Sequence, residues 1–465
     1  MRAILLIDFG STYTKLTAVD LSAPRVLGSA QAFTTVASDI SLGLEQALAR
    51  LEAATGHIQY EARLACSSAA GGLNMVACGL VPGLTSKAAR LAAFGAGAKV
   101  IRTFAYQLTD EDMAQLARIQ PDILLLCGGI DGGNSEVILH NAARIASAPG
   151  DYPVLVAGNR AAQAECVRLL EQGSHPVYTA PNVMPEMNTL NIEPAAEVIR
   201  QIFLKRIILA KGLGRAQRLL DGILMPTPAA VLKALRLLSK GTGDEAGLGD
   251  LIGVDLGGAT TDIYSIARGE PASPTTIMRG LPEPLAKRTV EGDLGMRYNA
   301  LGIQEAVGAA ALAQLSGQDE DAVQAYVVHC DSQPETLPGD ETQRQMDRAL
   351  AISAVGTALA RHAGTLERVY TPMGPMHEQR GKDLSQVRQV VVTGGALVYA
   401  MDLQQIMEQA LRRQEATALT PRQAGLMVDR GYILSAMGLL ADTHGAVALR
   451  LMKDIIGREE AYAAV

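Results

Sequence analysis

The chain of 465 residues is too long for one ordinary domain, so we expect two or three domains or subdomains. Hydrophobic residues make up 48% and charged residues 19%, a balance typical of a well-packed globular protein, which excludes wholesale disorder. The net charge of -7 at pH 7 argues against a nucleic-acid-binding surface, because phosphate contacts need clustered Lys and Arg side chains.

The five cysteines are scattered, with no CxxC pair. This excludes a zinc or iron–sulfur site built from cysteines and is typical of a reducing compartment. We expect Cys66 and Cys127 to be buried, inert thiols. The chain has no run of about 18 uncharged apolar residues, and its apolar N-terminal stretch is interrupted at Asp8. We therefore expect a soluble, cytoplasmic protein that binds neither nucleic acid nor membranes.

The first part of the chain predicts three short strands separated by turn-forming residues, namely RAILLID, YTKLTAVD and RVLGSAQAF. A helix is predicted at about 41–54, followed by two further strands. From about 98 to 180, strand-like runs alternate with helical ones, which predicts a small parallel α/β unit. A helical stretch at about 193–240 and a Gly-rich linker close this half of the chain.

The second half opens with DLIGVDLGGATTDIYSIA, which repeats the strand–turn–strand pattern of the N-terminus. The rest is predicted to be mostly helical, interrupted by one strand near 388–395. KRTVEGDLGMR, at 287–297, is interpreted either as a solvated helix end or as a helix that lines a nucleotide, with Lys287 and Glu291 as candidates. LLLCGGIDGGN, at 124–134, fits an anion site or a tight strand-to-helix turn capped by Asn134 or Ser135; the turn is favoured.

Two predicted strands end in Asp and continue into a turn of small residues. The first such segment offers Asp8, Gly10, Ser11, Thr12 and Lys15, and the second Asp255, Gly257, Gly258 and Thr260. Small residues let backbone N–H groups approach phosphate oxygens, and an Asp at a strand end can face a hydrated Mg²⁺. One such turn fits an ordinary hairpin equally well. The duplication predicts a triphosphate gripped from both sides.

These turns resemble the two phosphate motifs of the actin/Hsp70/sugar-kinase ATPases. QVVVTGGA at 389–396 resembles their adenosine motif, and MPTPAAVLKAL and DRGYILSAMGLL resemble their two connecting helices. All five motifs occur in the expected order. The resemblance implies an α/β, actin-like fold of two facing RNase-H-like lobes with ATP in the cleft. It also implies a first lobe that carries the α/β unit as an insertion.

Longer stretches are similar to the MutL/GlmL family, the accessory protein associated with adenosylcobalamin-dependent glutamate mutase. They are MRAILLIDFGSTYTKLTAVDL, ACSSAAGGLNMVACGLVP, LLLCGGIDGGN, AKRTVEGDLGMR and VVVTGGAL. This family is distinct from the DNA mismatch-repair protein that shares the name MutL. The resemblance implies an ATP-dependent, chaperone-like reactivation or assembly factor, with ATP and Mg²⁺ as cofactors and the subunits of an adenosylcobalamin-dependent mutase as partners.

Carried onto this sequence, the resemblance makes Asp8 and Asp255 the catalytic acidic residues, near Mg²⁺ and largely separated from it by water. It places the remaining candidates on the nucleotide: Gly10, Ser11, Thr12, Lys15, Gly257, Gly258, Ala259 and Thr260 at the phosphates, and Gly394, Gly395 and Ala396 at the adenosine. Ala259 replaces a glycine common in Hsp70 relatives, and Met225 stands where they have a Glu that organises hydrolysis. We therefore expect a Mg-dependent ATPase that is slow or stimulated by a partner.

The implied domains are the first part of the N-terminal lobe at 1–97, the insertion at 98–190, a helical return with the connecting helix at 191–245, and the C-terminal lobe at 246–465. The insertion is the candidate region for partner contact. Asp8 is expected to be an exposed cleft carboxylate whose replacement costs little stability. Two alternatives stay open: a small-molecule kinase, which would need a general base, and a polymerising actin-like scaffold.

Overall fold

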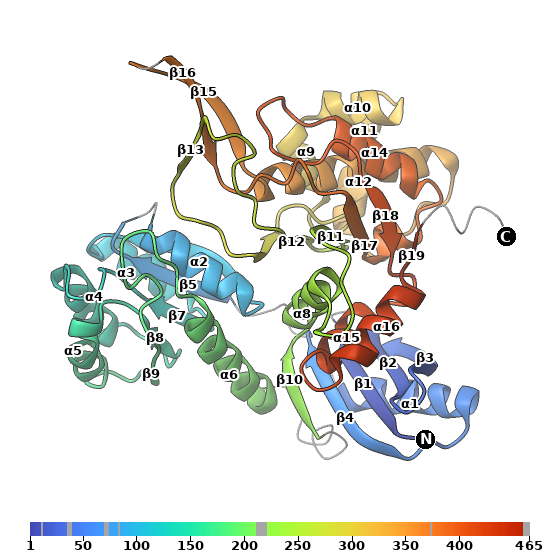
Figure 1. Ribbon diagram of the computed structural model, residues 1–465, viewed down its shortest axis with the longest axis horizontal. Coiled ribbons are helices and arrows are strands. Elements are labelled where there is room, and N and C mark those ends of the chain that lie inside the picture. The colour runs from blue at the N-terminus through green and yellow to red at the C-terminus, as the bar shows by residue number, and fades with distance from the viewer. Residues whose placement is uncertain are drawn as a thin grey trace. The chain divides into compact units, whose positions relative to one another are not determined.

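The computed structural model describes residues 1–10, 13–34, 40–68, 74–81, 84–210, 221–372 and 374–458 (Figure 1). The chain forms two compact units. Unit 1 comprises Met1–Ala234, Gly280–Pro282 and Leu434–Leu451, and unit 2 comprises Leu235–Arg279, Glu283–Ile433 and Met452–Val465. Within the described ranges, no helix is both long enough and apolar enough to cross a membrane.

Unit 1 is built on a five-stranded sheet with the order β10-β4-β1-β2-β3. Its strands are β1 (Ala3–Phe9), β2 (Tyr13–Asp20), β3 (Arg25–Phe33), β4 (Tyr60–Ser67) and β10 (Gly222–Pro226). The first three form the predicted antiparallel meander, while β4 runs parallel to both β1 and β10. Helix α1 (Ile40–Thr55) packs on β2 and β3. Every residue of β1 is buried, Asp8 included, and the other six are apolar.

Unit 2 repeats this topology in its main sheet, which has the order β14-β12-β11-β17-β18-β19. The strands are β11 (Leu251–Leu256), β12 (Thr261–Ile266), β14 (Ala286–Glu291), β17 (Gln389–Thr393), β18 (Gly425–Val428) and β19 (Gly457–Arg458). On one side of β11, β12 pairs antiparallel with β11 and β14 pairs antiparallel with β12, as β2 and β3 do in unit 1. On the other side, β17 and β18 are parallel to β11, as β4 and β10 are to β1. The predicted α/β fold with two RNase-H-like, actin-like lobes is confirmed.

A second sheet in unit 1 forms the insertion, and its five strands are all parallel, in the order β6-β5-β7-β8-β9. They are β5 (Asn74–Gly79), β6 (Lys99–Ala105), β7 (Ile123–Leu126), β8 (Val154–Val156) and β9 (Val177–Thr179). The sheet therefore begins at Asn74, before the predicted start at residue 98. The buried strand β5 belongs to it because it pairs with both β6 and β7.

Helices cover both faces of the insertion sheet. Residues of α2 (Thr85–Gly95) and α6 (Glu193–Ala210) share the core of unit 1 with one face. A separate apolar cluster on the other face contains residues of α3 (Asp110–Ile119), α4 (Glu136–Ala146) and α5 (Arg160–Leu170). Apolar positions recur at helical spacing in each of these segments, so each helix buries one stripe against the sheet.

The rest of the chain contains more strands than predicted. A three-stranded sheet, β13 (Thr276–Arg279), β16 (Gly374–Arg380) and β15 (Thr365–Thr371), extends from unit 2 (Figure 1). β13 and β16 are largely exposed and mix polar with apolar residues, so no long apolar run signals them. The remaining helices are α8 (Thr227–Lys240), α9 (Ala300–Val307), α10 (Ala309–Ser316), α11 (Glu320–Ser332), α12 (Glu341–His362), α13 (Gly395–Val398), α14 (Leu403–Arg412), α15 (Leu434–Leu440) and α16 (Gly445–Ile455).

Candidate functional site

Asp8, near the end of β1, has a buried carboxylate held by two hydroxyl groups. The residue is 8% exposed. Thr227 Oγ1 donates to Oδ1 over 2.6 Å, and Ser435 Oγ donates to Oδ2 over 2.9 Å. The expectation of an exposed carboxylate with little structural weight is therefore wrong. Asp8 is buried because β1 lies in the middle of the sheet, between β4 and β2.

The two hydroxyls come from the segments that resemble connecting helices. Thr227 is the first residue of α8 and Ser435 lies in α15. These helices pack closely: a Cβ added at Gly438 would lie 1.9 Å from the backbone oxygen of Ala230. Analysis of the sequence did not single out Thr227 or Ser435. The available signal was a hydroxyl residue in each connecting-helix motif.

The first turn is tight around Gly10. Its N–H donates to Tyr13 O over 3.1 Å, and a Cβ at Gly10 would lie 2.6 Å from the same oxygen. A larger residue does not fit this turn. Lys15 lies opposite Asp8 in the β1–β2 pairing, so the two side chains share a face of the sheet. The candidates Ser11 and Thr12 lie outside the described residues.

The second turn, in unit 2, follows Asp255 on β11. The N–H of Gly257 donates to Thr260 O over 2.9 Å, which closes the turn. The segment that follows β14 forms hydrogen bonds to this turn. Gly258 O accepts from two backbone N–H groups of that segment, and Ala259 O accepts from Asn299 Nδ2 over 2.8 Å. The turn is thus a rigid hairpin end.

The predicted adenosine motif meets this second turn. β17 runs parallel to β11 and pairs Thr393 with Asp255. Gly394 follows with φ +88°, and a Cβ there would lie 2.6 Å from Asp255 Oδ1. Gly395 and Ala396 begin α13. The structure therefore brings Asp255 and Gly394 together, whereas Asp8 and its turn belong to the other unit.

Two tyrosines that sequence analysis missed lie beside this motif. The Tyr432 hydroxyl lies 3.8 Å from the position of a Cβ added at Gly395. The rings of Tyr399 and Tyr432 are 6.3 Å apart, and Tyr399 is largely exposed. Burial, the neighbouring Tyr399 and the charge of Asp255 raise the pKa of Tyr432. Tyr432 also has φ +50°, an uncommon conformation for a bulky residue that is frequent at functional sites.

The segment 287–297 begins as a buried strand, so its interpretation as a helix, solvated or lining a nucleotide, is wrong. Lys287 lies on β14, where its ammonium group pairs with Glu283 at 2.5 Å and donates to His362 O at 2.6 Å. Glu291 accepts from Arg361 at 2.8 Å. These charges belong to networks inside unit 2.

The Gly-rich segment 124–134 forms a tight turn, as favoured. Gly129 has φ +74°, and a Cβ there would lie 2.2 Å from Asn134 O. Asn134 Oδ1 accepts from the Val137 N–H over 3.3 Å, while the buried Asn159 side chain accepts from Gly132 N–H over 3.0 Å. These internal bonds occupy amide groups that an anion would need.

The five cysteines are free and buried, which confirms the expectation for Cys66 and Cys127. Burial and the nearby charge of Asp8 raise the pKa of the Cys66 thiol well above its ordinary value. A thiol with a raised pKa is a poor nucleophile near neutral pH. Cys66 therefore contributes packing beside Asp8.

The duplicated sheet and its two Asp-ended strands define an actin-like protein of two RNase-H-like lobes. The profile of the MutL protein family matches residues 4–456. Protein MutL of Clostridium tetanomorphum is 47% identical over 456 residues, which cover 97% of this chain and 99% of that protein. The chain belongs to the MutL family, as the sequence motifs predicted.

Solved structures of similar topology are remote in sequence. A diol dehydratase-reactivating factor in nucleotide-free form is 11% identical with a TM-score of 0.38, covering 96% of this chain and 100% of that one. A glycerol dehydratase reactivase is 11% identical with a TM-score of 0.35, covering 94% and 99%.

Proposed function

We propose that this protein is an ATP-dependent reactivation or assembly factor for an adenosylcobalamin-dependent mutase, such as glutamate mutase. One observation carries the nucleotide part: the central strand of each lobe bears an Asp near its end, Asp8 or Asp255, and leads into a tight turn of small residues. The mutase part rests on the resemblance to the MutL/GlmL family.

The surroundings of Asp8 fit a hydrated Mg²⁺. A carboxylate offers about four lone-pair sites, and the hydroxyls of Thr227 and Ser435 use two of them. The Cys66 thiol also hydrogen-bonds to this carboxylate, and a remaining site can accept a hydrogen bond from metal-bound water, which Mg²⁺ retains in proteins. Within the described part of the chain, no three His, Cys, Asp or Glu side chains are grouped to hold a metal, so the triphosphate and water would supply most ligands. When bound, Mg²⁺ would neutralise phosphate charge.

The adenosine is assigned to Gly394, Gly395 and Ala396 in unit 2. Gly395 leaves space in front of the Tyr432 hydroxyl. The exposed ring of Tyr399 offers a face for stacking on the base, an interaction worth about 1–3 kcal/mol per base. Asp255 would face the metal from this unit.

Asp8 also connects nucleotide binding to a movement of the lobes, through the helices to which its carboxylate is hydrogen-bonded. Its two hydroxyl partners lie on α8 and α15, and the chain passes between the units at Ala234–Leu235 and at Ile433–Leu434. A change in the hydrogen bonds of Asp8 on nucleotide binding would therefore reach two of the segments at which the chain passes between the units. We infer a hinge motion that opens the mutase and releases spent coenzyme.

The test is Mg-ATP turnover by the purified protein, alone and with glutamate mutase inactivated by its own turnover. Recovery of mutase activity that needs both ATP and free coenzyme supports the proposal, and Asp8→Asn serves as the matched inactive control. A phosphorylated small molecule would favour a kinase instead, and ATP-dependent sedimentation a scaffold. ATP binding without any response of the mutase overturns the mutase assignment.

A further inference from the structure

Tyr106 adopts a conformation that tyrosine rarely takes. It follows β6 at the edge of the insertion sheet and has φ +66°, in the left-handed region. A side chain with a Cβ atom is strained there, whereas glycine is not. The residue is 60% exposed, so burial of the ring returns little of the free energy that the strain costs.

Hydrogen bonds from both sides hold this conformation. The Tyr106 N–H donates to Gly79 O over 3.1 Å, at the end of the neighbouring strand β5. Its carbonyl accepts from Asn141 Nδ2 over 2.9 Å, and Asn141 Oδ1 accepts from the Leu108 N–H over 2.8 Å. Asn141 is 1% exposed and lies on α4. A buried amide thus fixes the loop that carries Tyr106.

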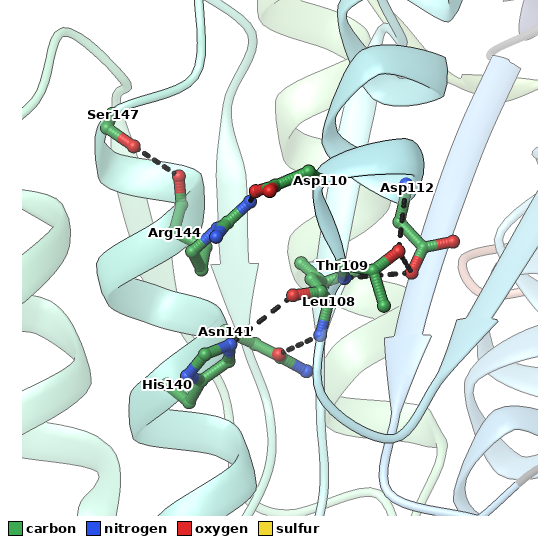
Figure 2. Close-up of polar contacts among 8 residues, drawn as sticks. All are labelled: Leu108, Thr109, Asp110, Asp112, His140, Asn141, Arg144 and Ser147. Atoms are coloured by element: carbon green, nitrogen blue, oxygen red, sulfur yellow. Dashed lines mark hydrogen bonds and ion pairs between the residues drawn. The ribbon is translucent and has the colours of Figure 1, made fainter.

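Further polar contacts connect the rest of the loop to α3 and α4, as Figure 2 shows. His140 bonds to Leu108 O over 3.3 Å, and Arg144 pairs with Asp110 at 2.5 Å. A reciprocal capping box at Thr109 closes the first turn of α3. The ring of Tyr106 is therefore presented on a preorganised support, which lowers the entropic cost of using it in binding.

We propose that Tyr106 anchors this protein to its partner enzyme by entering an apolar pocket whose rim is basic. The inference rests on the proposed function and names the docking point for it. Rigid tyrosines are frequent anchors of protein interfaces because they bury a large area at low entropic cost.

Charge selects the kind of partner. Asp110 and Glu111 are exposed at the start of α3, four and five residues beyond the ring, and Asp112 follows them. Arg144 is the basic partner of Asp110. Arg102, four residues before Tyr106 on β6, is also exposed, so the three carboxylates exceed the two cations Arg102 and Arg144 by one. This small acidic excess favours a basic rim on the partner and disfavours a second copy of the same surface.

The decisive variant is Tyr106→Gly. Glycine accepts the left-handed conformation, so we expect an equal or higher midpoint of unfolding and unchanged basal Mg-ATP turnover. Affinity for turnover-inactivated glutamate mutase, measured by surface plasmon resonance, should fall at least about tenfold. Tyr106→Phe should retain most of the affinity. Tyr370→Ala, at a tyrosine that is 79% exposed on β15, is the matched control and should bind as the wild type does.

Each outcome decides a separate point. If the wild type binds the mutase and Tyr106→Gly binds equally well, the docking inference is overturned while the proposed function stands. If the wild type binds no mutase, the proposed function falls and the docking inference with it. If Tyr106→Gly converts a self-associated protein into a smaller species in sedimentation, a second copy occupies this surface and the enzyme does not.

Discussion

Ser435 Oγ donates a 2.9 Å hydrogen bond to Asp8 Oδ2, although the two residues are 427 positions apart in the chain. With Thr227 on the other carboxylate oxygen, Asp8 joins the first strand of unit 1 to two helices. In a buried setting such bonds stabilise the fold and orient the carboxylate at the same time. The candidate metal-facing residue therefore also connects β1 to α8 and α15 through its hydrogen bonds.

This double role changes what Asp8→Ala should do. We expect loss of Mg-ATP turnover together with a destabilisation of about 2 kcal/mol, because two buried hydroxyls lose their acceptor. Asp8→Asn keeps one acceptor oxygen and should lose turnover with a smaller cost in stability. Denaturant unfolding and a phosphate-release assay measure both quantities. Turnover retained in a folded Asp8→Asn protein would remove Asp8 from the proposed site.

Thr227 should matter through its hydroxyl rather than its shape. Thr227→Val removes the donor to Asp8 Oδ1 with little change in volume, so the carboxylate loses orientation. We expect Mg-dependent ATP affinity to fall about tenfold by calorimetric titration, the equivalent of about 1.4 kcal/mol. Thr227→Ser keeps the hydroxyl and should restore most of the affinity. Equal affinities of the Val and Ser variants would contradict a positioning role.

The two glycines of the adenosine motif should respond differently to alanine. Gly394 has φ +88°, and an added Cβ would lie 2.4 Å from Leu256 O. Gly394→Ala should therefore destabilise the protein by several kcal/mol, on the order of 3. Gly395→Ala meets no atom closer than the Tyr432 hydroxyl at 3.8 Å and is the matched control. Thermal unfolding distinguishes them, and similar midpoints would refute the strain argument.

A buried lysine should make stability depend on pH. Lys382 is almost fully buried, and its Nζ donates to Leu285 O over 2.8 Å. Burial and the nearby charge of Lys287 lower its pKa to about 7, and the carboxylate of Glu283 opposes this effect. An unfolded lysine titrates near 10.4. Between these values the unfolded chain binds a proton that the folded chain does not, so stability rises as pH rises.

Lys382→Met tests this effect with a side chain of similar length. The difference in unfolding free energy between wild type and variant should change from pH 7 to pH 9.5 in favour of the wild type, and it should be constant below about pH 6. Comparing the two proteins cancels the titration of other groups. A pH-independent difference would show that Lys382 keeps its ordinary pKa.

The sequence by itself determined the fold class, the family and the two tight turns that follow Asp-ended strands. Each of these signals is local: an apolar strand, an Asp and a turn of small residues fit within about ten positions, and their order along the chain is read directly. Gly10 and Gly394 were found in the same way, because a tight turn restricts the residue types that it accepts.

Only the tertiary structure decided which distant groups meet. Thr227 and Ser435 reach Asp8 across 219 and 427 positions, and no local pattern indicates a hydroxyl aimed at a carboxylate. The sequence suggested either a solvated or a nucleotide-lining Lys287, because its charge is visible in the sequence while its partner Glu283 and its burial are not. Strand pairing places residues beside one another without regard to sequence separation, so burial and partnership follow from topology and not from local spacing.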